Sequence, residues 1–311
     1  MLSRRTVRIK VLQLLYNLNR DSDLTFHQAK KLYWDQIDAT FHLYLFNLYS
    51  FIQVAKESLE DDAKRKAKYL PTEEDRLFKP KLYDNPIVRY LDTNRELLKL
   101  FKKHDFESKA DKDLYKNLYN EYLKEASYQQ FLLEKTDNER ILEELLNLYR
   151  FCRKNSIFTE MMEDHYFNWE DDNSVVIGAT KKTIKACPND DDRFFYEYYP
   201  EAETIKKFGE TLMVKAFEND KNFSEMIGAQ LVNWDQDRVA IIDMILLKMA
   251  LTEFLQFESI PTKVTINEYL DIAKLYSTPK SNEFINGVLV ALQAKLESEN
   301  LIHKSGRGLL E

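Results

Sequence analysis

The chain has 311 residues, of which 44% are hydrophobic and 31% charged, so it can bury a large core and wholesale disorder is excluded. Its 6 glycines and 7 prolines are few for the many turns of a β-sandwich or barrel, which favours helices joined by short connections. The net charge of −7 excludes a polycation, so nucleic-acid binding would require a local basic patch.

The two cysteines, Cys152 and Cys187, do not form a disulfide framework and favour a reducing compartment. The basic start of the chain is followed by neither a continuous apolar segment nor a small-residue cleavage site, which argues against a signal peptide. No run of about 18 apolar residues occurs. We therefore predict a cytoplasmic protein without a membrane span.

The first 20 residues predict an amphipathic helix with a basic flank. At about 100° per residue, one face is apolar and consists of Val7, Val11, Leu14, Leu15 and Leu18. Along one edge of that face lie Arg5, Arg8, Leu12 and Tyr16. Because this segment contains no acidic residue, its cations are candidates for binding an anionic partner.

The rest of the chain predicts a series of helices. Residues 22–60 continue as helix, prolines break the pattern within 61–86, and residues 87–167 are helical again. We predict a polar break at 168–176 and favour a helix over a strand for the ambiguous segment that follows it. Helices resume from 190. Thr265 and Glu268 form a capping box, and Thr278 and Pro279 begin the last helix.

The sequence contains none of the common catalytic or metal-binding motifs. The histidines are scattered, and the sequence has no HExxH, CxxC, GxSxG or phosphate-binding glycine loop. The acidic clusters at 163–172 and 190–192 lack the order of a calcium loop and predict solvated connections. We predict a protein that is not an enzyme and that has no metal or cofactor.

Three segments resemble the NusB family of transcription antitermination factors. The strongest is "DRVAIIDMILLKMALTEFLQFESIPTKVTINEYLDIAKLYSTPKSNEFINGVL", together with "SRRTVRIKVLQLLY" at the start and "FGETLMVKAFENDKNFSEMI" in between. The resemblance covers roughly 1–50 and 195–300. With its extra middle part and its "GRGLL" tail, the chain is most similar to the long form of Bacteroidetes-type bacteria.

The resemblance implies an all-α fold of two packed three-helix bundles with a large, mainly helical insertion. We predict an N-terminal bundle at 1–60, an insertion at 61–190 and a C-terminal NusB-like bundle at 191–311. The insertion is expected to pack on the N-terminal bundle, to mediate dimerisation or to contact another partner. The sequence leaves these possibilities, and the oligomeric state, open.

The resemblance also implies a function and partners. Such a factor binds boxA RNA together with NusE, a small-subunit ribosomal protein, and acts indirectly on the RNA polymerase elongation complex during rRNA operon transcription. One alternative is a NusE chaperone or ribosome-assembly scaffold without specific RNA binding. A remote alternative is an RNA methyltransferase-associated domain, which would need the glycine-rich cofactor loop that this chain lacks.

Candidate site residues follow from this chemistry, because RNA requires cations for phosphates and planar groups for unstacked bases. The RNA-binding candidates are Arg4, Arg5, Arg8, Lys10, Gln13, Tyr16, Lys280 and Phe284. Asp243 matches an acidic residue through which the family contacts NusE. Family members often have a basic residue just before the phenylalanine, where this chain has Glu283. We interpret Gly287 as a site where a neighbouring helix approaches closely.

Overall fold

The computed structural model describes residues 2–231 and 239–305, and every regular element in these ranges is a helix. The chain divides into two compact units. The terminal unit contains Leu2–Ile37 and Pro200–Glu311, and the central unit contains Asp38–Tyr199. The predicted all-α fold with a large helical region beyond the NusB-like part is confirmed.

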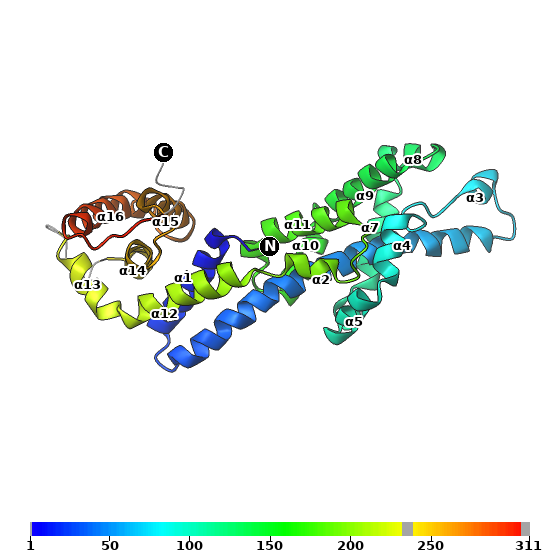
Figure 1. The fold of residues 1–311 in the computed structure, drawn as a ribbon. Helices are drawn as coiled ribbons and strands as arrows, with labels where there is room; N and C mark the ends of the chain where they lie inside the picture. The colour runs from blue at the N-terminus through cyan, green and yellow to red at the C-terminus, as the bar shows by residue number, and fades with distance from the viewer. Residues whose placement is uncertain (1, 232–238, 306–311) are drawn as a thin grey trace. The chain divides into compact units, whose positions relative to one another are not determined.

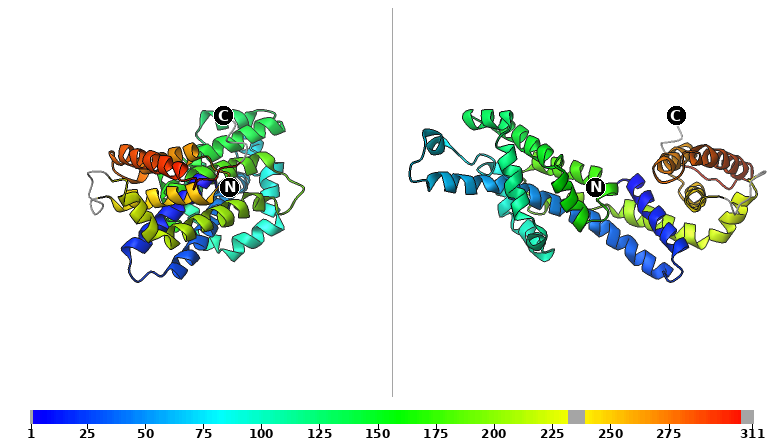
Figure 2. Two further views of the ribbon diagram at one scale, coloured as in Figure 1. Left: turned by 60° about the vertical axis from the view of Figure 1, so that its left-hand side comes forward. Right: turned by 180° about the vertical axis from the view of Figure 1, so that it is seen from behind.

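The terminal unit consists of two sets of packed helices. The first set is α1 (Arg4–Arg20), the start of α2 (Phe26–Lys66), the π-helical η2 (Glu203–Glu210) and α12 (Thr211–Glu218). The second set is α14 (Ile241–Gln256), α15 (Thr262–Tyr276) and α16 (Ser281–Ser298), which lie side by side in all views (Figures 1 and 2). The short α13 (Asp220–Gly228) packs against α14 and α16.

Helix α1 forms as its periodicity predicts. The Ser3 hydroxyl caps its start by accepting a hydrogen bond from the backbone N–H of Thr6 at 3.2 Å. Val7, Val11 and Leu14 are fully buried, which confirms the apolar face. This face packs against η2, α12 and α14, and the burial fixes the rotation of α1 about its own axis.

Side chains of α1 and α2 pack directly against the backbone of η2 at Gly209. An added Cβ there would overlap the Tyr33 hydroxyl and Val7 Cγ1, so only glycine fits between α1 and α2 at this point. The Tyr33 hydroxyl donates to the carbonyl of Ile205 at 2.6 Å, which ties α2 to η2. Gly287, where we predicted the close approach of a neighbouring helix, has no atom within 4 Å of a built Cβ, so that prediction was wrong.

The central unit has its own aromatic-rich core. The second part of α2 runs through it, and Tyr44, Phe46 and Phe51 are fully buried there. Its other elements are α3 (Glu73–Leu77), α4 (Pro86–Thr93), α5 (Arg95–Lys103), α6 (Phe106–Lys109), α7 (Lys112–Tyr122), α8 (Ala126–Leu133), α9 (Asn138–Cys152), α10 (Ser156–His165), α11 (Trp169–Ala186) and η1 (Phe194–Tyr198).

Two boundaries differ from the sequence-based expectation. The units divide within α2, between residues 37 and 38, and again between 199 and 200, instead of at 60 and 190.

The polar segment 168–176 is not a break but the first half of α11. Its acidic residues suit the positive end of the helix dipole, and Asp172 accepts hydrogen bonds from Asn168 at 2.5 Å and Thr40 at 2.6 Å. The predicted helix after it is confirmed.

Candidate functional site

Two exposed arginines begin α1. Arg4 lies 5.6 Å from the centroid of the Phe208 ring, within cation–π range. Arg5 is 46% exposed and makes a bidentate pair with Glu268 at 2.9 Å, with a further contact to Asp271 at 2.9 Å. These hydrogen bonds hold the pKa of Glu268 below its usual range. Arg5 is therefore accessible but already has two carboxylate partners.

Arg8 has a different role from the predicted one. Its side chain is only 3% exposed, and its guanidinium forms two hydrogen bonds with the fully buried Glu253, at 2.7 and 2.9 Å. Burial opposes its charge, but hydrogen bonds and the negative charge of Glu253 outweigh this and raise the pKa of Arg8. The same carboxylate accepts from Tyr269 at 2.7 Å and Thr265 at 3.2 Å. Arg8 therefore holds α1, α14 and α15 together.

This network also corrects the predicted start of α15. The helix begins at Thr262, one turn before the predicted capping box. The Thr265 hydroxyl donates to Glu253, and the Glu268 carboxylate faces Arg5 and Arg8. Both side chains that resembled a local cap are therefore committed to tertiary contacts.

The remaining candidates on α1 differ in exposure. Lys10 is 2% exposed, so its ammonium group is not presented at the surface. Gln13 is half-buried, whereas Tyr16 is 36% exposed near the end of the helix. Of the predicted RNA-binding residues on α1, those with at least partly exposed side chains are Arg4, Arg5, Gln13 and Tyr16.

Lys280 and Phe284 line one open groove at the start of α16. The groove has a volume of about 620 Å³, and Gly287, Val288, Gln230 and Leu231 complete its lining together with Glu283. The helix begins at Ser281 instead of at Pro279, and the Thr278 hydroxyl pairs with that of Ser281 at 2.8 Å. Since Gly287 has no side chain, the groove stays open beside Phe284.

The starts of α1 and α16 both contact the middle of α15. Arg5 reaches Glu268 and Asp271, and the Asn282 amide donates to the carbonyl of Leu270 at 3.2 Å. Two segments far apart in the sequence are thus fixed to one short stretch of α15, residues 268–271. This arrangement was not predictable from helical periodicity, which does not specify the neighbours of a helix.

Asp243, which the resemblance matched to a residue that contacts NusE, is buried. Its carboxylate is 5% exposed and accepts hydrogen bonds from Ser277 at 2.5 Å and Ser281 at 2.7 Å. Ser277 follows the last residue of α15, and Ser281 is the first residue of α16. Asp243 therefore anchors the start of α16, and its charge is satisfied within the chain.

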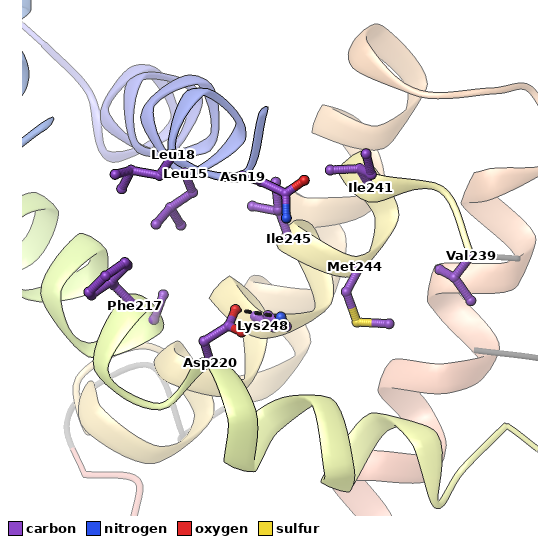
Figure 3. A pocket seen from close by; sticks show the side chains of 11 residues that line it. Leu15, Leu18, Asn19, Phe217, Asp220, Val239, Ile241, Met244, Ile245 and Lys248 are labelled. Atoms are coloured by element: carbon purple, nitrogen blue, oxygen red, sulfur yellow. Dashed lines mark hydrogen bonds and ion pairs between the residues drawn. The ribbon is translucent and has the colours of Figure 1, made fainter. Parts of the chain in front are cut away.

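An apolar pocket lies on another side of α14 (Figure 3). Its volume is about 520 Å³. Its lining residues come from α1, α12, α13 and α14 and from the segment before α14: Leu15, Leu18, Asn19, Ala216, Phe217, Asp220, Val239, Ile241, Met244, Ile245 and Lys248. Figure 3 shows Leu15 and Phe217 turned toward the space beside α14, with the Asp220–Lys248 ion pair, at 2.5 Å, on its rim.

Sequence reasoning missed this pocket, although one signal was present. The segment 241–254 is apolar on nearly all sides, more than burial of a single helix face requires. The structure shows that part of this excess lines the pocket, because Ile241 and Met244 are half-buried.

The described part of the chain contains neither a reactive thiol nor a cluster of metal-ligating side chains. Cys152 and Cys187 are both buried, and burial raises the pKa of each thiol to about 12. Among residues 2–231 and 239–305, no group of His, Cys, Asp and Glu side chains is arranged to hold a metal ion. Within the same ranges, no helix has the length and apolar composition that crossing a bilayer requires.

The terminal unit is thus an all-α pair of helix bundles with an open groove and an apolar pocket. The sequence profile described as the NusB family matches residues 173–294, a range that includes Asp243, Lys280 and Phe284. The chain belongs to the NusB family. The range does not include α1, so the candidates at the N-terminus lie outside it.

Curated relatives match about a third of this chain. A Salinibacter ruber protein named "Transcription antitermination protein NusB" is 40% identical over 110 residues, which are 35% of this chain and 69% of the relative. Proteins of the same name from Chloroherpeton thalassium and Bacillus velezensis are 40% and 34% identical, over 50% and 83% of their own lengths. The solved structure of T. maritima NusB is 22% identical, covers 52% of this chain and 94% of its own, and has a TM-score of 0.29.

Proposed function

We propose that this protein is a transcription antitermination factor that binds boxA-type RNA together with the ribosomal protein NusE. The observation that carries the proposal is the groove with Lys280 and Phe284, which lies within the segment that matches the NusB family. An ammonium group and an aromatic ring in one groove suit a phosphate followed by an unstacked base. Arg4 and Tyr16, which are exposed on α1, supply a second cation and ring.

The groove predicts a specific loss of RNA affinity. Replacing Phe284 by alanine removes the ring on which a base would stack, which is worth about 1–3 kcal/mol per base. We therefore expect Phe284→Ala to bind boxA RNA roughly ten- to a hundredfold more weakly in filter binding at fixed salt. Phe284→Tyr, which keeps the ring, should bind like the wild type. Equal affinities of the alanine and tyrosine variants would remove Phe284 from the RNA site.

Specific RNA binding separates this function from a scaffold or NusE chaperone. The scaffold or chaperone function is favoured by two observations: Arg5 is neutralised by carboxylates, and Arg8 is buried. Helix α1 therefore has fewer free cations than its sequence predicted. The wild-type protein should prefer boxA RNA to a scrambled RNA of the same length, and NusE should strengthen this preference. Equal affinity for the two RNAs, with NusE still bound, would establish the scaffold function instead.

The apolar pocket is our proposed contact for NusE. It offers the hydrophobic centre that protein interfaces have, with Lys248 and Asp220 as a polar rim. Asp243 is not the direct contact in this proposal, because its carboxylate is occupied by Ser277 and Ser281. It acts instead by holding α16 in place.

A charge placed in the pocket should abolish this interaction. Met244 is half-buried in α14, and Met244→Glu would put an unpaired carboxylate against the apolar partner surface. We expect NusE affinity, measured by calorimetry, to fall at least about tenfold, with RNA binding in the absence of NusE unchanged. Val264→Glu is the matched control, because Val264 is 45% exposed on α15 and lies outside the pocket. Equal losses in both variants would place the NusE site elsewhere.

A further inference from the structure

Helix α9 packs against α11 in the central unit (Figure 1), and basic residues stand near the C-terminal ends of both helices. They occupy the last turns of both helices and the residues just after α9. We call this set the α9–α11 basic patch, and it consists of Arg150, Arg153, Lys154, Lys181, Lys182 and Lys185. It lies outside every segment that resembles the NusB family by motif, and only its α11 residues fall within the range of the family profile.

The patch has no carboxylate partners among the residues that the structure describes. Arg140, at the other end of α9, contacts three carboxylates, those of Glu134, Glu143 and Glu144. Within the described ranges, the only hydrogen bond from an arginine side chain of the patch joins Arg150 to the amide oxygen of Asn147, at 2.9 Å. The Nε of Arg153 is buried without a hydrogen-bond partner.

The cations also act on one another. The pKa of Lys181 is lowered, first by burial and then by the positive charges of Arg153, Arg150 and Lys185. Every charged group that contributes to this shift is positive. The protein has a net charge of −7, so this group of cations is a local positive region on an acidic chain. Binding of an anion would relieve the repulsion between them.

The composition of the patch favours a nucleic-acid backbone over a protein. Protein interfaces are centred on buried aromatic or aliphatic anchors. Among the described residues, the large apolar side chains that are exposed include none from 147–154 or 178–186. Arginine forks and lysine ammonium groups on two adjacent helices suit phosphates spaced along a strand, and the missing aromatic platform indicates contacts without base recognition.

We propose that the α9–α11 basic patch binds phosphate groups of the RNA strand outside the boxA element, independently of sequence. The inference rests on the proposed RNA-binding function of the terminal unit. It gives the central unit a role in affinity, whereas the groove at Phe284 accounts for recognition. An RNA that extends beyond boxA should therefore bind more tightly than boxA alone, at low salt especially.

The test uses the full chain with Arg150→Gln, Lys181→Gln and Lys185→Gln combined, so that the half-buried Arg153 stays in place. The matched control is Lys66→Gln, Lys99→Gln and Lys112→Gln, which removes the same charge from exposed lysines that have carboxylate partners. Affinity for a long boxA-containing RNA is measured from low to high salt. Melting curves establish that both variants fold.

We expect the patch variant to bind the long RNA at least about tenfold more weakly at low salt and to reduce the slope of log K against log salt by about 2, since each phosphate contact to a single strand contributes about 0.7. The control should behave like the wild type. A patch variant with wild-type affinity and slope would overturn the proposal, as would an equal loss in the control. If the patch binds an acidic protein and not RNA, the patch variant will also keep wild-type affinity and slope for RNA.

The test of the patch can be interpreted even if the proposed function is wrong. If the wild type fails to distinguish boxA from scrambled RNA, recognition by the terminal unit is wrong. The salt slope of the patch variant on scrambled RNA still tests the patch, because backbone contacts do not depend on sequence. A variant that lowers both affinities equally, and so keeps their ratio, supports the division of roles proposed above.

Discussion

Replacement of Arg8 by alanine is expected to lower the free energy of unfolding of the terminal unit by about 3–5 kcal/mol. The substitution leaves the Glu253 carboxylate fully buried without its bidentate partner, and only Tyr269 and Thr265 still donate to it. Removing one member of a buried ion pair costs more than the pair itself contributes, because the remaining charge is not solvated. Lost packing of Arg8 against Phe208 and Tyr269 adds to this cost.

Native-state hydrogen exchange of amides in α1 and α14 measures this effect in the terminal unit without interference from the central unit. Arg5→Ala is the matched control on the same helix, because its pair with Glu268 is largely exposed and should contribute at most about 1 kcal/mol. Similar losses for the two variants would mean that the Arg8–Glu253 pair does not hold the helices together. RNA experiments should therefore change Arg4 and Arg5 and leave Arg8 intact.

Glycine-to-alanine substitutions at two positions should have opposite effects on stability. At Gly209 a methyl group would overlap the Tyr33 hydroxyl and Val7, both of which are fully buried and cannot move away. We expect Gly209→Ala to cost about 1–3 kcal/mol through overpacking and to weaken the hydrogen bond from Tyr33 to Ile205. This cost exceeds the helix propensity that alanine contributes, which is up to about 1 kcal/mol.

Gly287→Ala provides the comparison within the same chain. No atom lies within 4 Å of a built Cβ there, so the substitution should stabilise α16 by up to about 1 kcal/mol. Thermal melting of both variants, with hydrogen exchange in η2 and α16, measures the two changes. A neutral Gly209→Ala would show that α1 and α2 yield at this contact.

The sequence was sufficient to predict that the chain is helical and which family it belongs to. The apolar period of α1 predicted the buried Val7, Val11 and Leu14, because a helix that packs on one side has to repeat its apolar residues every three to four positions. The C-terminal segment that resembled the NusB family lies within residues 173–294, which the family profile matches. Residues 232–238 and the tail from 306, including the "GRGLL" motif, lie outside the described part of the chain.

Periodicity failed where a polar residue stands at the edge of the apolar face. Arg5 and Arg8 are three residues apart and looked equivalent in the sequence, yet one is exposed and the other buried. What decides between them is Glu253, which lies 245 residues from Arg8 in the chain and meets it only when α14 packs on α1. The pairing of Arg8 with Glu253 could not be predicted from a single sequence.

Local patterns were misleading for the same reason. Thr265 and Glu268 have the spacing of a capping box but serve Glu253, Arg5 and Arg8, and Asp243 resembled an exposed contact but holds Ser277 and Ser281. The free energy of these tertiary contacts exceeds that of a local cap, which is worth about 1 kcal/mol.

By itself, then, the amino-acid sequence determined that this protein is helical, which faces of its helices are apolar and which family it belongs to, since these follow from local periodicity and motif order. Only the tertiary structure decided which cations remain free to bind a partner. That outcome depends on which carboxylates the fold places beside each cation: Arg8 has one in the core, Arg5 has two at the surface, and the α9–α11 basic patch has none among the described residues.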